Sequence, residues 1–128
     1  MQSKCVNKKL NLQNLFLGFH SACLISEWII NKQIDVNQLL LRQNCFGDSG
    51  FEKISKAILR QSSIFYLDMA QNGLSVKCAL SLFTMLRHNN TLVSLDLGST
   101  LGGSLPNRFG KEFSLSLGRV LESNASLI

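Results

Sequence analysis

Apolar residues recur along this chain with a period of about 28 residues, a length that indicates a repeat architecture. Residues 36–58 align without a gap on residues 64–86, and one more shift by the same step brings Leu92 and Leu95 into the same positions. The aligned apolar pairs are Val36 with Ile64, Leu39 with Leu67, Leu41 with Met69, and Ile58 with Leu86. The register extends backwards to Leu10.

Each unit of the pattern predicts a short strand followed by a helix. Leu39 and Leu41 alternate with other residues, which is typical of a strand. After a turn, Phe51, Ile54 and Ile58 recur at helical spacing. One strand and one helix cannot bury their apolar faces alone, so we expect the units to stack in an array.

The register divides the chain into units of unequal length. A single domain over 1–128 contains repeats at 7–35, 36–63, 64–91 and 92–126, and residues 127–128 open a further repeat. The fourth repeat is the longest, and we place its seven extra residues near 101–109. Because nothing polar caps the last strand, we expect either further repeats or a partner that covers the C-terminal end.

The repeated segments "LLLRQNCFGDSGFEKISKAI" and "LDMAQNGLSVKCALSLFTML" resemble the leucine-rich repeat family, specifically its ribonuclease-inhibitor-like subfamily. The resemblance implies an α/β, right-handed leucine-rich-repeat solenoid, or horseshoe, with parallel strands on the concave face and helices on the convex face. It also implies that Asn44 and Asn72 tie neighbouring loops together by side-chain hydrogen bonds. Leu15 and Thr100 stand where the first and fourth repeats should have this asparagine.

The residues between the strand leucines should point out of the concave face and offer a binding surface. Arg42, Leu40, Tyr66 and Asp68 form a mixed patch of interface character. Asp68 and Asp96 stand on adjacent strands about 5 Å apart, a separation at which paired carboxylates can be catalytic. The resemblance favours another interpretation, because aspartate is common there in the family. We therefore expect solvated or partner-facing carboxylates.

The stretch around the insertion superficially looks like a phosphate-binding loop. Gly103 and Gly110 enclose six residues instead of the four that a phosphate loop needs, and Glu112 follows the lysine. These departures argue against a nucleotide site. Insertions in repeats form loops on one rim, often a binding rim, and we predict Arg108 and Phe109 as its contact residues.

Composition excludes several other classes of protein. The chain has 128 residues, 45% of them hydrophobic, and a formal net charge of +5. Its four cysteines match no zinc spacing. We expect no cofactor, no nucleic-acid partner and no membrane segment, and a reduced, intracellular, cytoplasmic location. The helices carry basic residues that form either a solvated surface or a docking face for an acidic partner: Lys53, Lys56, Arg60, Lys77, Arg87 and Arg119.

These observations favour a non-catalytic protein–protein interaction scaffold that binds another protein through the concave face or the inserted rim loop. Two alternatives stay open. The chain could be a structural spacer in a cytoskeletal, axonemal or ciliary assembly, or the repeat region of a sensor or regulator whose effector domain lies elsewhere. No nucleophile–base pair or metal set points to an enzyme.

Overall fold

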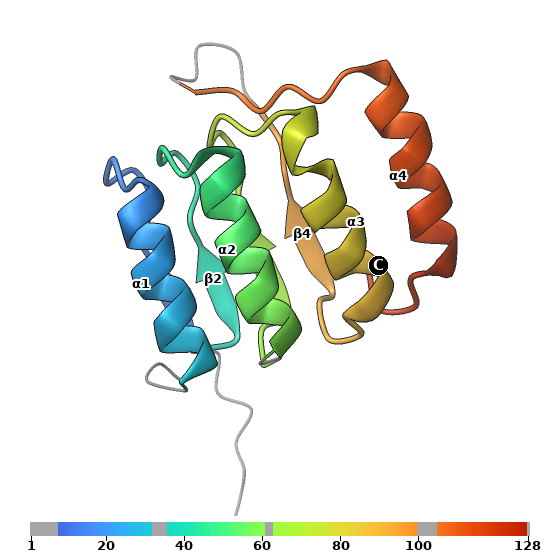
Figure 1. The fold of residues 1–128 in the computed structure, drawn as a ribbon. Coiled ribbons are helices and arrows are strands. Elements are labelled where there is room, and N and C mark those ends of the chain that lie inside the picture. The colour runs from blue at the N-terminus through green and yellow to red at the C-terminus, as the bar shows by residue number, and fades with distance from the viewer. Residues whose placement is uncertain (1–7, 32–35, 61–62, 100–104, 128) are drawn as a thin grey trace, which may run out of the picture.

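The computed structural model describes residues 8–31, 36–60, 63–99 and 105–127, and the structural findings below concern these residues. Strands and helices alternate along them, as the hydrophobic pattern predicts (Figure 1). The strands are β1 (Lys9–Asn11), β2 (Gln38–Leu40), β3 (Tyr66–Asp68) and β4 (Ser94–Asp96). The helices are α1 (Phe19–Ile30), α2 (Gly47–Arg60), α3 (Ala79–His88), which the 3₁₀ turn η1 (Val76–Cys78) precedes, and α4 (Lys111–Ser123).

The four described strands form one parallel sheet in the order β1-β2-β3-β4. Leu10, Leu39, Leu67 and Leu95 are aligned across it, so the pairing follows the register that the sequence repeat predicts. Parallel neighbours need a crossover connection, which the helices supply. The predicted α/β class with a parallel sheet is therefore confirmed.

All four helices lie side by side on the same face of the sheet (Figure 1). Each contacts its neighbours in the sequence, α1 with α2, α2 with α3, and α3 with α4. The opposite face of the sheet carries none of these helices. We call it the open face, and its side chains come from the strand positions that alternate with the core leucines.

The core lies between the sheet and the helix layer. Leu39 and Leu67 on the strands are fully buried, as are Ile54 and Leu82 on the helices. Leu95, the matching residue on β4, is only partly buried. The difference arises because an end strand has a neighbouring strand on one side alone.

A recurrent backbone conformation turns the chain out of each of the first three strands. Asn14, Gln43 and Gln71 occupy equivalent positions and have φ angles of 55°, 58° and 53°. The left-handed region costs an ordinary residue about 1–2 kcal/mol. Because all three units tolerate this cost at the same point, the corner belongs to the repeat and is not a local irregularity.

Candidate functional site

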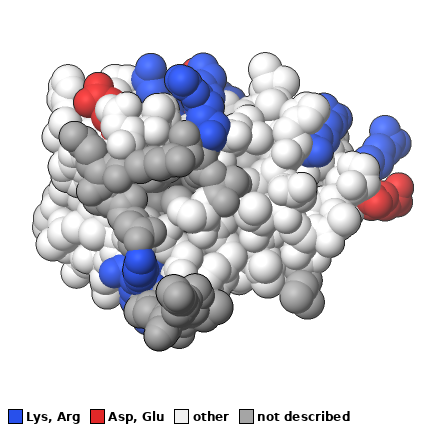
Figure 2. Space-filling model, turned by 90° about the horizontal axis from the view of Figure 1, so that it is seen from below, with Lys and Arg blue, Asp and Glu red and all other residues white. Residues whose placement is uncertain are grey.

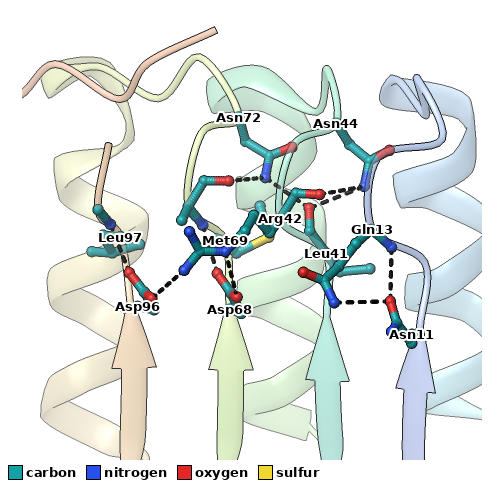
Figure 3. A network of polar contacts seen from close by, with 12 residues as sticks. Asn11, Gln13, Leu41, Arg42, Asn44, Asp68, Met69, Asn72, Asp96 and Leu97 are labelled. Atoms are coloured by element: carbon teal, nitrogen blue, oxygen red, sulfur yellow. Dashed lines mark hydrogen bonds and ion pairs between the residues drawn. The ribbon is translucent and has the colours of Figure 1, made fainter. Parts of the chain in front are cut away.

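Arg42 organises the polar residues of the open face. It lies just beyond the end of β2, and its side chain extends over β3 toward β4 (Figure 3). Nε donates to Asp68 Oδ2 at 3.0 Å, and Nη2 donates to Asp96 Oδ2 at 2.6 Å. The hydrogen bond to Asp68 is the largest cause that raises the pKa of Arg42, and the charges of both carboxylates act in the same direction. The guanidinium is therefore a permanent cation.

The two carboxylates are held from both sides. Their other oxygens accept backbone N–H groups two residues ahead, from Ala70 at 3.0 Å and from Gly98 at 2.9 Å. Asp68 is only 4% exposed, so the expectation of a solvated carboxylate is wrong for this residue, and its role as a partner contact stays a prediction. Asp96 is partly exposed and shares Arg42. With all four oxygens accepting hydrogen bonds, the pair has a structural role in the sheet.

Leu40 and Tyr66 share the open face with this cluster. The sequence predicts that Leu40 points out of the sheet as part of a binding surface, but its side chain is only 8% exposed. It is covered because it lies in register between Asn11 and Asp68 on the strands beside it. Tyr66 is half-buried. Burial raises the pKa of its phenol, and the carboxylates of Asp68 and Asp96 add to this effect. Tyr66 therefore presents a neutral hydroxyl beside a charged cluster.

Asn44 and Asn72 make the hydrogen bonds that the family resemblance implies. Asn44 Nδ2 donates to the carbonyl of Leu12 at 2.8 Å, and its Oδ1 accepts the N–H of Leu17 at 3.0 Å. Asn72 Nδ2 donates to the carbonyl of Leu41 at 2.8 Å. Each buried amide thus joins its own corner to the corner of the preceding unit, and Figure 3 shows this for Asn72 and Leu41.

The fourth unit has the same asparagine, which the sequence analysis missed. Asn107 is 8% exposed and performs this role. Its Nδ2 donates to the carbonyls of Met69 and Leu97 at 3.0 and 3.1 Å, and its Oδ1 accepts the N–H groups of Asn72 and Leu74 at 3.0 and 2.9 Å. Thr100, which we compared with Asn72, lies outside the described residues. Seven residues beyond Thr100, the length of the insertion, the sequence has Asn107. The position of the asparagine could therefore be found from the sequence.

This assignment moves Arg108 and Phe109 out of the predicted insertion. They follow Asn107 and belong to the regular unit, and the positions 101–104 of that prediction lie outside the described residues. Arg108 is exposed, and its N–H donates to the carbonyl of Leu74 at 2.7 Å. Phe109 is half-buried and stacks on Phe113, with ring centroids 4.3 Å apart. Phe109 therefore packs within the domain, and its role as a partner contact stays a prediction, as does that of Arg108.

Another carboxylate, that of Asp48, links two units on the helix side. Asp48, in the first turn of α2, accepts the N–H of Ser75 at 2.8 Å and its hydroxyl at 2.7 Å. Cys78 lies close by and is buried. Burial, with the charge and hydrogen bond of Asp48, raises the pKa of the Cys78 thiol to about 12. This thiol stays protonated and is a packed side chain.

The face of the molecule seen from below does not carry one continuous basic surface (Figure 2). Figure 2, which views the molecule from below, shows separate groups of Lys and Arg with uncharged surface between them. A groove of about 490 Å³ between α1 and α2 is bordered by Lys53, Lys56 and Arg60. Lys56 is paired with Glu52 there, at 2.9 Å.

Within the described residues, no helix combines the length and apolar character that crossing a bilayer requires. The same residues contain no group of three or more His, Cys, Asp or Glu side chains placed to hold a metal ion.

Comparison with known proteins gives a likeness of fold. No family model matches the chain, and no curated protein does. Among solved structures, 41 chains match. One of them is the actin-binding site 2 domain of leiomodin-1, with a TM-score of 0.79 and 19% sequence identity. The match covers 94% of this chain and 66% of that one. The chain thus shares its α/β architecture with a domain whose name describes an actin-binding site.

Proposed function

We propose that the chain is a leucine-rich-repeat module of the ribonuclease-inhibitor-like type, a right-handed solenoid with repeats at 7–35, 36–63, 64–91 and 92–126. Two findings support the proposal. The strands keep one register across the sheet, and corner asparagines make equivalent hydrogen bonds in successive units.

The function that we propose is non-catalytic binding of another protein through the open face. The observation that carries it is the cluster of Arg42, Asp68 and Asp96 beside Tyr66 on a face without helices. The Arg42 side chain is 29% exposed although both carboxylates hold it. A guanidinium fixed before binding loses little conformational entropy when a partner arrives, and Arg and Tyr are enriched at binding hot spots.

The partner that we propose is a cytoskeletal protein, with actin as the first candidate. The support is the likeness of fold to the leiomodin-1 domain named for actin binding, which covers 94% of this chain. The proposal places the protein at the cytoskeleton. It favours a scaffold that holds actin over a passive spacer, because a spacer needs no fixed charged cluster on its helix-free face.

Direct binding to actin tests this proposal. Monomeric actin would be titrated against the labelled chain, and filamentous actin would be tested by co-sedimentation. We expect Tyr66→Ala to weaken binding about tenfold, as loss of an aromatic contact does. Leu80→Ala is the matched control, because Leu80 is 76% exposed on α3, on the helix side.

The two parts of the proposal fail in different ways. If neither form of actin binds the folded chain, actin is not the partner. If Tyr66→Ala and Leu80→Ala bind actin as tightly as the unmodified chain does, the open face is not the binding surface. Far-ultraviolet circular dichroism of each variant confirms that the fold is retained.

A further inference from the structure

The outer edge of β4 carries a backbone N–H group whose equivalents at the other strands donate to a carbonyl of the next strand. At the β2–β3 junction the N–H of Leu41 donates to the carbonyl of Asp68, and at the β3–β4 junction the N–H of Met69 donates to that of Asp96, both at 2.9 Å. Leu97 is the next residue in this series. No carbonyl among the described residues accepts its N–H, so the edge offers a strand-pairing site.

An apolar groove lies behind this edge. It has a volume of about 460 Å³, and six leucines contribute to its lining: Leu86, Leu95, Leu97, Leu117, Leu121 and Leu127. Leu121 is 41% exposed, whereas its counterparts Ile58 and Leu86 in the preceding helices are 0% and 1% exposed. Among the described residues, no helix covers α4 in the way that α3 covers α2 and α4 covers α3.

The opposite end of the stack carries the complementary features. Leu24 and Trp28 on α1 are 50% and 36% exposed. Leu24 corresponds to Lys53 of α2, which lines the groove between α1 and α2. The flank of α1 that carries Leu24 is thus the one that would face a preceding helix, and Trp28 corresponds to the fully buried Ala57.

The edge of β1 matches the edge of β4 in the same way. The carbonyls of Leu40 and Arg42 accept N–H groups of the preceding unit, from Leu12 at 2.9 Å and from Asn14 at 3.0 Å. The equivalent carbonyls in the first unit are those of Asn11 and Gln13. No described residue donates a hydrogen bond to them, so they are acceptors of the kind that the β4 edge requires.

We propose that two copies of the chain associate head to tail, with β4 of one copy paired in parallel with β1 of the next. The internal register, carried across this junction, joins three N–H groups to three carbonyls: Leu97 to Asn11, Ser99 to Gln13, and Lys9 to Val93. Lys9 of one copy then lies beside Ser94 of the other. Asp96 is two residues beyond Ser94 on the same face of the sheet, so the junction brings a cation toward a carboxylate. Trp28 enters the leucine-lined groove as an aromatic anchor.

The two surfaces of this junction are different, so the association is heterologous. Each added copy leaves one free end of each kind, and the assembly grows in a line without closing. The junction lies at the ends of the stack and leaves the open face accessible. The inference therefore does not rest on the proposed function.

Sedimentation velocity of the 128-residue chain at increasing concentration tests the proposal. The mean sedimenting mass should at least double over the accessible range, since association follows mass action. Two one-sided variants place a charge in the interface: Leu121→Glu at the α4 end and Leu24→Glu at the α1 end. Each should stay monomeric alone, because one of its two surfaces is blocked.

Mixing the two variants distinguishes this junction from non-specific aggregation. The Leu24→Glu chain keeps an intact α4 end, and the Leu121→Glu chain keeps an intact α1 end, so the mixture should form a one-to-one dimer and nothing longer. Leu80→Glu introduces the same charge at a residue that is 76% exposed on α3, away from both ends of the helix layer, and this variant should associate like the unmodified chain. A monomeric unmodified chain, or variants that show no dimer on mixing, would overturn the proposal.

Discussion

Arg42 and Asp96 are joined across an intervening strand, with Nη2 of the arginine 2.6 Å from Oδ2 of the aspartate. The same guanidinium holds Asp68 on the strand between them, at 3.0 Å. One side chain thus connects three successive strands of the sheet, whereas each backbone ladder connects only two. The order of the open face therefore depends on this cation.

Removing the guanidinium should destabilise the chain. Arg42→Gln leaves the carboxylate of Asp68, which is 4% exposed, without its cation, and we expect a loss of about 1–2 kcal/mol in the free energy of unfolding. Asp96→Asn, whose side chain is 35% exposed, should cost less than about 1 kcal/mol because water screens that contact. Urea unfolding measures both, and equal losses would contradict the unequal burial.

Asn107 should be as important to the fold as the two asparagines that the sequence identifies. Asn107→Ala removes hydrogen bonds from four backbone groups around a buried site, and we expect a cost of about 2–4 kcal/mol. Asn90→Ala is the matched control, because Asn90 is exposed, and its effect should stay within about 0.5 kcal/mol. Urea unfolding compares the two, and a neutral Asn107→Ala would show that the corner tolerates the loss.

Phe109 and Arg108 are adjacent in sequence but should differ in their effect on stability. Phe109→Ala removes a ring that stacks on Phe113, and half-burial places the expected cost at about 2–3 kcal/mol. Arg108→Ala keeps the backbone bond to Leu74 and should change stability by less than about 0.5 kcal/mol. Thermal unfolding checks the pair. Similar melting temperatures for the two variants would mean that Phe109 is not packed.

Cys78 should make stability depend on alkaline pH. Its pKa is about 12 in the folded chain against an ordinary value of 9.0, so the folded thiol keeps its proton where the unfolded thiol loses it. The stabilisation from this difference is complete below the unfolded pKa and is lost as pH rises through the folded one. Relative to Cys78→Ala, the free energy of unfolding of the unmodified chain should fall by at most about 1.4 kcal/mol per pH unit above about pH 9.

The comparison with Cys78→Ala cancels the contributions of all titratable groups that the two chains share. Urea unfolding of both proteins at about pH 8 and about pH 10 gives the required difference. A difference in unfolding free energy that stays constant between the two conditions would show that the thiol ionises normally in the folded chain.

The strand register could be predicted from the sequence because each strand residue has a fixed counterpart in the next unit. Leu39, Leu67 and Leu95 are aligned as the repeat requires. The ion pair of Asp68 could not be predicted from that register. The strand residue opposite Asp68 is Leu40, whereas its partner Arg42 lies two residues further along the chain. Only the length and direction of the Arg42 side chain decide that it reaches both carboxylates.

The fourth unit shows where counting along a repeat fails. The regular spacing places the corner position of the fourth unit at Thr100, which is not an asparagine. An insertion, however, can displace a repeated role along the chain instead of removing it. The corner amide is required because backbone groups of two units are buried there. Looking for a polar residue that could satisfy those groups would have identified Asn107 and returned Phe109 to the core.

The lengthened fourth unit has a consequence for engineering. Asn107 lies farther along the chain from Asn72 than Asn72 lies from Asn44, yet the same amide bonds form in both cases. Ser99 Oγ accepts the N–H of Asn107 at 2.6 Å and donates to its carbonyl at 3.0 Å, so a clasp holds the two ends of the intervening segment together. The number of residues between Ser99 and Asn107 can therefore change without changing the distance between the strands. An epitope tag or a reporter peptide grafted between Ser99 and Asn107 should therefore leave the rest of the domain unchanged.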